Sequence, residues 1–249
     1  MEKGFADIVF DILRSLPDYR RLRYLELGCG DGFMLHSLSN EGANAQGTTF
    51  LDKSDDYIRS RDYPEGLTVK HGVDLSMPLP YSDDAFDVVY SMEVIEHIEG
   101  HRNFISEAAR VLRPGGWFVM TTPNLHRLIS RLHFALCGVH LVKERRPTFK
   151  MPLERMGEFH VRCPDFPLLH WLMWQSGLRI HTLECEHVHL LSKALMLVSP
   201  FLRPFTRIGL NRHERPGEDL DEAVDDLSKW MNSRVLLTSE RICLLAQKT

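Results

Sequence analysis

The stretch LELGCGDG at residues 25–32 decides the fold of this 249-residue chain. A short apolar run at 23–27 leads directly into three glycines, Gly28, Gly30 and Gly32, and a helical pattern follows them. Glycine can adopt positive φ and lets the backbone approach a ligand closely, and the N-terminus of the next helix offers unpaired N–H groups. The stretch therefore predicts a strand, a turn and a helix that together hold a nucleotide-like ligand.

The spacing of these glycines excludes two common nucleotide motifs. A dinucleotide fingerprint reads G-x-G-x-x-G, whereas the third glycine here, Gly32, comes one residue early. The phosphate-binding pattern G-x-x-x-x-G-K-[ST] does not occur in the sequence. The turn is thus predicted to bind a ligand without a pyrophosphate.

Apolar strands and amphipathic helices alternate along the chain on both sides of this turn. We expect further strands at 43–50, 67–71, 86–91, 117–121, 178–185 and 241–246, and helices at 5–16, 33–40, 55–61, 103–112, 125–135, 167–177 and 221–230. Such alternation predicts an α/β fold with a Rossmann-like, doubly wound, mostly parallel sheet whose ligands lie beyond the carboxyl ends of the strands. An inserted helical or amphipathic segment, residues 190–210, precedes the last strand.

The composition is that of a globular protein able to bury a core, with 43% hydrophobic and 26% charged residues. The formal net charge of −4 argues against a protein that coats nucleic acid, so a nucleic-acid partner is not expected. Five scattered cysteines without C-x-x-C spacing predict free thiols. Neither a secretory signal nor a membrane-spanning run is recognisable, and we therefore expect a cytoplasmic location.

Four motifs, in order, resemble those of class I S-adenosylmethionine-dependent methyltransferases, in particular the type 11 and type 12 group. They are LELGCGDG at 25–32, FDVVYS at 86–91, AARVLRPGG at 108–116 and WFVMTTPN at 117–124. Together they span residues 25–124 in the expected order, which makes chance an unsatisfactory explanation. The resemblance implies a cofactor-binding core at residues 1–124. Residues 125–249 would add acceptor-site insertions and the final strands of the same structural domain.

The resemblance also implies which residues hold S-adenosyl-L-methionine. Glu26 would contact the methionine ammonium group. The other implied cofactor contacts are Gly28, Cys29 and Gly30 beneath the methionine and ribose, Asp74 and Leu75 along the adenine, and Ser91 and Met92 from the fourth strand. A carboxylate for the ammonium and small residues for close approach suit a zwitterionic nucleoside.

The end of the second strand departs from the family pattern. The family commonly places there an acidic residue that binds the ribose hydroxyls, and here Thr49 stands at that place. A threonine hydroxyl can still form a hydrogen bond to the ribose, but without charge assistance. The alternative is that Asp52 reaches the ribose from the next turn.

A carboxylate–histidine cluster follows the fourth strand at Glu93, Glu96 and His97. In an α-helix these residues would share one face, and two carboxylates with an imidazole suit Mg²⁺ or a similar divalent cation. The pattern resembles that of ubiquinone-biosynthesis O-methyltransferases. It is also similar to the metal ligands of small-RNA 2′-O-methyltransferases, which implies His160 as a further ligand. Without a metal, His97 would instead be the general base, with Glu93 and Glu96 beside it.

Two segments of the second half are candidates for contact with the acceptor. Residues 125–146 carry seven Arg, Lys and His side chains at 126, 127, 131, 133, 143, 145 and 146 and predict a basic surface or an ordinary solvated helix face. Residues 190–210 combine apolar side chains with Lys193, Arg203 and Arg207, which predicts peripheral membrane contact, a lid or a homodimer contact.

The function predicted from the sequence is methyl transfer to a hydroxyl of a small-molecule, glycan or lipid-linked acceptor. A hydroxyl needs a base or a metal to remove its proton, and the Glu93–Glu96–His97 cluster supplies one. One alternative is an RNA 2′-O-methyltransferase that uses the same cluster with a metal. Another is a catalytically silent domain that only binds S-adenosylmethionine.

Overall fold

A computed structural model describes residues 4–50, 66–141, 160, 162–186, 204, 209 and 218–249. Within them the chain forms a seven-stranded sheet in the order β3-β2-β1-β4-β5-β7-β6. The strands are β1 Arg23–Leu27, β2 Asn44–Thr48, β3 Thr68–Lys70, β4 Phe86–Met92, β5 Leu112–Pro123, β6 Leu178–Glu184 and β7 Arg241–Lys248. β1 to β5 pair in parallel, while β7 runs antiparallel to both β5 and β6. The predicted Rossmann-like, mostly parallel sheet is confirmed.

Six of the described α-helices lie close to predicted ranges, whereas the short helix Arg234–Thr238 was not predicted. The described α-helices are α1 Phe5–Ser15, α2 Phe33–Asn40, α4 His101–Val111, α5 Leu128–Cys137, α6 Phe166–Gln175, α9 Glu218–Met231 and α10 Arg234–Thr238, with 3-10 turns η1 Tyr19–Arg21 and η2 Ile95–His97. The predicted helix at 55–61 and the insertion at 190–210 lie outside the described residues. In the described part of the chain, no helix combines the length and the apolar character needed to cross a bilayer.

The start of α5 was predicted three residues too early, at residue 125 instead of Leu128. The side chain of Asn124 explains the delay. Its Nδ2 donates to the carbonyls of Leu236 and Ser239, at 2.8 and 2.9 Å, and its Oδ1 accepts from the backbone N–H of His126. These bonds hold the exit from β5 in a non-helical conformation before α5 begins.

Residues 113–116, at the end of the AARVLRPGG motif, form an irregularity inside β5, which begins earlier than the predicted strand at 117–121. The pairing of β4 with β5 shifts register between Phe86 and Val88, and Gly115 has a φ of 73°. A Cβ on Gly116 would lie 2.8 Å from the carbonyl of Arg113. The glycines therefore allow a bulge that lets the strand begin directly at the end of α4.

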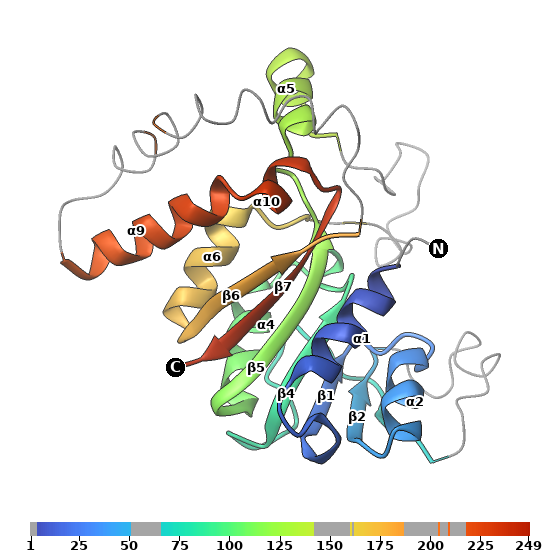
Figure 1. Cartoon of the computed structure of the whole chain (residues 1–249). Helices are drawn as coiled ribbons and strands as arrows, with labels where there is room; N and C mark the ends of the chain where they lie inside the picture. The colour runs from blue at the N-terminus through green and yellow to red at the C-terminus, as the bar shows by residue number, and fades with distance from the viewer. Residues whose placement is uncertain are drawn as a thin grey trace.

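Alternate residues of the central strands face two separate cores. Tyr24, Val88 and Tyr90 pack with α1 and α2, whereas Leu25 and Val89 pack with α4 and α6. The two helical layers therefore cover opposite faces of the sheet (Figure 1). From β1 the chain moves outward to β2 and β3 and then returns to β4 on the other side. The carboxyl ends of β1 and β4 thus form the switch point at which ligands bind in such sheets.

Candidate active site

The glycine turn after β1 packs directly against the loop after β4. Gly28 has a φ of 76°, and a Cβ there would lie 2.7 Å from Cγ2 of Val94. The backbone N–H of Cys29 donates to the carbonyl of Thr48 at 2.8 Å, which ties the turn to β2 as well. Gly30 also has positive φ, 51°, but a Cβ there would meet nothing within 4 Å. The structure therefore requires glycine at Gly28 for packing and leaves open space beside Gly30.

Gly47, inside β2, has a packing role that the sequence did not reveal. A Cβ there would overlap Cδ1 of Leu35 and lie 2.9 Å from Cβ of Cys29. The small residue lets α2 and the glycine turn approach the sheet together. Only the contacts with Leu35 and Cys29 identify this role, because nothing in the local pattern of residues 44–48 singles Gly47 out.

Glu26 is a buried carboxyl between the two central strands. Tyr90 donates its hydroxyl proton to Oε2 of Glu26 at 3.0 Å, and the two residues are register partners on β1 and β4. Burial raises the pKa of Glu26 to about 8, and the hydrogen bond from Tyr90 opposes this shift. Such a carboxyl favours a cationic ligand, because a nearby positive charge would stabilise its ionised form.

The other predicted cofactor residues lie at neighbouring strand ends. Thr49 is buried directly after β2, and its carbonyl accepts from the N–H of Val73, which brings the loop that carries Asp74 beside it. Oδ1 of the exposed Asp74 accepts from the N–H of Ser76 at 2.8 Å. Asp52, the alternative to Thr49, lies outside the described residues. The structure thus places Thr49 and Asp74 on adjoining loops.

The other three residues of this set have different surroundings. Leu75 is buried in the hydrophobic core rather than exposed to a ligand. Ser91 is fully buried in β4, with an Oγ that has no hydrogen-bond partner among the described residues, and Met92 is half-buried at the strand end.

The tertiary structure brings Glu96, His97 and His160 together. Each offers one ligand atom, and these three atoms lie within 4.8 Å of one another. The rings of His97 and His160 meet edge to face at 5.0 Å, and Nε2 of His160 lies 4.0 Å from Oε1 of Glu96. The backbone N–H of Arg162 donates to the carbonyl of Glu96, which fixes the second segment against η2. The His160 prediction, drawn from a distant part of the chain, is therefore consistent with the geometry.

The α-helix assumed for residues 93–97 is wrong. Glu93 adopts a φ of 53°, and only Ile95–His97 form a single 3-10 turn. Glu93 consequently lies outside the Glu96–His97–His160 group, and its carboxylate pairs with Nε of Arg241 at 3.1 Å. Its left-handed backbone is held by a hydrogen bond from its N–H to Oγ1 of Thr121 at 3.0 Å. A non-glycine residue held in this conformation is a feature of functional sites.

Glu96 is the most strongly perturbed acid of the cluster. It is fully buried, and neither of its carboxylate oxygens has a hydrogen-bond partner among the described residues. Burial raises its pKa to about 9, and the nearby charge of Glu93 adds to the shift. Burial also raises the pKa of Glu93, and Arg241 opposes that shift. Two orphaned oxygens beside two imidazoles fit a divalent cation, which would supply the missing positive charge.

Two further residues support the cluster without having been predicted. Sγ of Cys163 lies 3.8 Å from Nδ1 of His160, on the side of the ring away from Glu96. Arg241, the first residue of β7, reaches Glu93 because β7 runs antiparallel to β5 and begins at the carboxyl ends of the parallel strands. The contact of Arg241 follows from the topology of the sheet, whereas Cys163 and His160 are only three residues apart in the chain.

Four of the seven basic residues predicted at 125–146 are described, and of these Arg127 is buried while His126, Arg131 and His133 are half-buried. Nη1 of Arg127, a 5%-exposed side chain, pairs with Glu240 at 2.8 Å. Nε2 of His126 pairs with Oδ1 of Asp165 at the same distance. Lys143, Arg145 and Arg146 lie outside the described residues. The exposed part of α5 is instead apolar and presents Leu132, Phe134 and Leu136.

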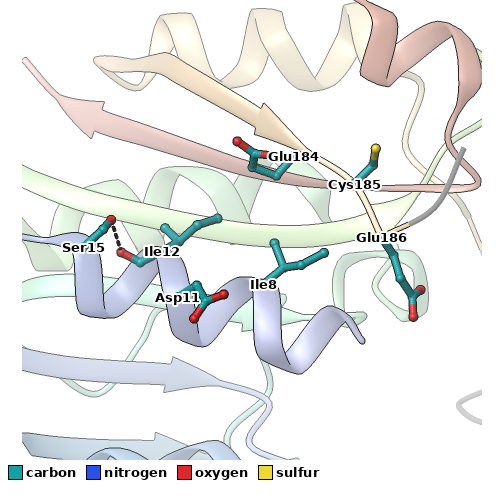
Figure 2. Close-up of a pocket in the computed structure, with 7 residues that line it drawn as sticks. All are labelled: Ile8, Asp11, Ile12, Ser15, Glu184, Cys185 and Glu186. Carbon is teal, nitrogen blue, oxygen red and sulfur yellow. Dashed lines mark hydrogen bonds between the residues drawn. The ribbon is translucent and has the colours of Figure 1, made fainter. Parts of the chain in front are cut away.

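An open cavity of about 510 Å³ lies between α1 and the end of β6 (Figure 2). It is lined by Ile8, Asp11, Ile12, Ser15, Glu184, Cys185 and Glu186. This lining contains none of the predicted cofactor, catalytic or metal residues. The charge of its Glu186 adds to the raised pKa of Glu93. The cavity is therefore separate from the site formed by the glycine turn.

Residues 25–120 match the family described as "Methyltransferase domain". The chain is 38% identical over 128 residues to a probable S-adenosylmethionine-dependent methyltransferase of Mycolicibacterium smegmatis, covering 49% of this chain and 48% of that protein. It is 30% identical over 132 residues to a ubiquinone biosynthesis O-methyltransferase of Parvibaculum lavamentivorans, covering 52% and 50%. The chain thus spans about half the length of these curated relatives.

Solved structures agree with this fold over nearly the whole chain. An S-adenosylmethionine-dependent methyltransferase from Mesorhizobium loti has a TM-score of 0.54 at 18% identity and covers 98% of this chain and 99% of its own. A geranyl diphosphate C-methyltransferase from Streptomyces coelicolor, solved with Mg²⁺, geranyl diphosphate and S-adenosyl-L-homocysteine, has a TM-score of 0.54 at 14% identity and covers 98% and 78%. Residues 25–120 are thus similar to a methyltransferase domain, and the solved structures share the fold of the chain.

Proposed function

We propose that this protein transfers the methyl group of S-adenosyl-L-methionine to a hydroxyl group. The observation that carries the proposal is the grouping of Glu96, His97 and His160 beside the glycine turn, through the Val94 contact with Gly28. In the transfer the sulfonium carbon–sulfur bond breaks, an oxygen–carbon bond forms and the hydroxyl proton leaves. A hydroxyl needs a group that removes this proton, and the cluster provides one next to the cofactor turn.

The cofactor residues follow the predicted set, and the geometry supports their roles to different degrees. Glu26 would hold the methionine ammonium, and Gly28, Cys29 and Gly30 would pass beneath the methionine and ribose. Gly30 has the open space for such an approach, and no cation among the described residues pairs with the buried carboxyl of Glu26. Thr49 and Asp74 would meet the ribose and adenine from adjoining loops, and Ser91 and Met92 would meet the cofactor from β4.

A divalent cation, Mg²⁺ or similar, would be held by Glu96, His97 and His160. When bound, such an ion lowers the pKa of a coordinated hydroxyl. Glu93 would remain outside the ligand set, because its carboxylate pairs with Arg241. In a metal-free reaction, His97 would itself take the hydroxyl proton, so its roles as ligand and as base exclude each other.

The acceptor is proposed to be a small-molecule, glycan or lipid-linked hydroxyl compound. The named ubiquinone relatives are O-methyltransferases, and the exposed apolar residues of α5 suit an acceptor with a hydrophobic part. An RNA 2′-O-methyltransferase is the second candidate, favoured by the grouping of His160 with Glu96 and His97 and opposed by the net charge of −4. Membrane contact through 190–210, a homodimer, a cytoplasmic location and the division at residue 124 stay predictions.

One set of measurements tests the proposal. Calorimetry should show that S-adenosyl-L-homocysteine binds, and labelled S-adenosylmethionine should methylate a member of small-molecule, glycolipid or RNA pools. Metal analysis and chelation then separate the two roles of His97. Full activity of protein shown to be metal-free would exclude a metal from the reaction and leave His97 as the base. Absence of cofactor binding would overturn the proposed function as a whole.

A further inference from the structure

Arg131, in α5, is a cation for which the described structure provides no counter-charge. Its Nε donates to the carbonyl of His126 at 2.7 Å, and its Nη2 is buried without a hydrogen-bond partner. None of the described carboxylates forms an ion pair with it, and burial lowers the pKa of its guanidinium. Arg131 is half-buried as a whole, but a guanidinium nitrogen that is removed from water without an anion is costly, so Nη2 calls for a partner that the described part of the chain does not supply.

The two basic residues just before α5, His126 and Arg127, do have acidic partners. Arg127 pairs with Glu240, and His126 pairs with Asp165. Both acids are thereby occupied by other bases. Arg131 therefore differs from His126 and Arg127, which lie within five residues of it, in having no acidic partner among the described residues.

Two segments link the region of Arg131 to the proposed active site, through the acidic partners of Arg127 and His126. Glu240, the partner of Arg127, precedes Arg241, which pairs with Glu93. Asp165, the partner of His126, follows the segment of Arg162, whose backbone N–H donates to Glu96. Figure 1 shows α5 rising from the end of β5, beyond the edge of the sheet where the strands' carboxyl ends lie. A molecule bound at the cluster could therefore extend toward Arg131.

We propose that Arg131 binds an anionic oxygen group, a carboxylate or a phosphate, of the methyl acceptor. This inference rests on the proposed function, because it assigns the acceptor of that reaction a negative charge. A guanidinium donates through several N–H groups in a planar fork that matches both groups. The acceptor class is then an anionic hydroxyl compound, and Arg131 determines specificity without touching the reacting atoms.

The first test compares Arg131→Met with the matched variant Arg127→Met, at the residue that caps the N-terminus of the same helix. Removal of this half-buried charge, which has no counter-ion among the described residues, should leave the melting temperature of the unliganded protein unchanged or raise it. Arg127→Met lowers it, because Glu240 loses its partner. A fall for Arg131→Met as large as that for Arg127→Met would show a structural role and overturn the proposal.

The second test measures anion binding with inorganic phosphate and with acetate as probes, each exchanged for chloride at constant ionic strength. Either phosphate or acetate should raise the melting temperature of the wild-type protein and of Arg127→Met by about 2–4 °C. The probe that gives the larger shift in melting temperature indicates whether the acceptor carries a phosphate or a carboxylate. Arg131→Met should show no shift. Equal shifts in all three proteins, or none in the wild type, would contradict the inference.

The two proposals fail in distinguishable ways. S-adenosyl-L-homocysteine should bind Arg131→Met with wild-type affinity, because the cofactor turn is untouched. Cofactor binding without an Arg131-dependent anion effect would overturn only this inference, whereas loss of cofactor binding in the wild type would overturn the proposed function. With an acceptor from the methyl-transfer screen, Arg131→Met should raise KM at least about tenfold and change kcat little. An unchanged KM would exclude Arg131 from acceptor binding.

Discussion

Tyr90 and Glu26 face each other across the two central strands, and the tyrosine hydroxyl donates to the glutamate carboxyl at 3.0 Å. Both side chains are buried on the face that α1 and α2 cover. The bond holds the carboxyl at the carboxyl end of β1, beside the glycine turn. Because Glu26 has a pKa of about 8, it carries a proton at neutral pH in the free protein.

Cofactor binding should therefore release a proton from Glu26. The methionine ammonium would stabilise the carboxylate and lower its pKa, so affinity should rise with pH up to about 8. Calorimetry with S-adenosyl-L-homocysteine at pH 7, in buffers of different ionisation enthalpy, measures the release. Glu26→Gln should bind more weakly and release no proton. A binding heat independent of the buffer would contradict this role of Glu26.

The same carboxyl makes a prediction for the unliganded protein. The folded-state pKa of Glu26 lies above its ordinary value of 4.5, so the proton favours the folded state. Its contribution to the free energy of unfolding is present below about 4.5 and is lost as the pH rises toward about 8. Glu26→Gln should remove this loss, and denaturant unfolding of both proteins across that range is the measurement. Parallel curves would show that Glu26 titrates normally.

Gly28→Ala and Gly30→Ala should separate packing from ligand approach. At Gly28 the new Cβ would lie 2.7 Å from Val94, and the φ of 76° adds strain, so we expect a loss of about 2–4 kcal/mol. At Gly30 a Cβ meets nothing, so the loss should stay near 1 kcal/mol while cofactor binding weakens. Urea unfolding and calorimetry provide the two readouts. Equal stability losses would refute the packing role of Gly28.

Glu96→Gln should weaken divalent-cation binding at least about tenfold, because an amide replaces the carboxylate of the ligand group. The control is Glu99→Gln, an exposed residue of the same loop, which should bind metal as the wild type does. Titration of Mn²⁺ followed by paramagnetic resonance gives both dissociation constants. Identical constants for the two variants would remove Glu96 from the metal site.

Asp226 joins α9 to α6. Its Oδ2 accepts from Nε2 of His170 at 2.9 Å and from Nε1 of Trp230 at 3.1 Å. Although burial opposes ionisation, the bond with His170 holds the pKa of Asp226 below its ordinary value of 3.8. Asp226→Asn should therefore cost about 1–3 kcal/mol at pH 7. The difference should shrink as the pH falls below about 4, where Asp226 itself takes up a proton.

The neighbouring Asp225→Asn is the control for Asp226, because Asp225 is exposed on the same helix. Thermal unfolding at pH 7 and at pH 3 compares the two variants with the wild type. A pH-independent difference for Asp226→Asn, or an equal effect of Asp225→Asn, would show that the ionised carboxylate is not what joins the helices.

The secondary structure was predicted well where the signal is local. The apolar run at 23–27 and the glycines after it matched β1 and its turn, and helix periodicity placed α1, α2 and α4 within two residues. The errors fall where a distant contact overrides the local pattern. Asn124 delays α5 through bonds to residues more than 100 positions away, and Ile95–His97 form a 3-10 turn after a left-handed Glu93.

The sequence by itself determined the sheet, the glycine turn and the residue types of the candidate site, because periodicity and turn chemistry act between near neighbours. Only the tertiary structure decided how these residues combine. It joined His160 to Glu96 and His97, set Glu93 apart with Arg241, and left Arg131 without a counter-charge among the described residues. Such contacts depend on strand order and burial, which place residues far apart in the chain side by side and remove their charges from water.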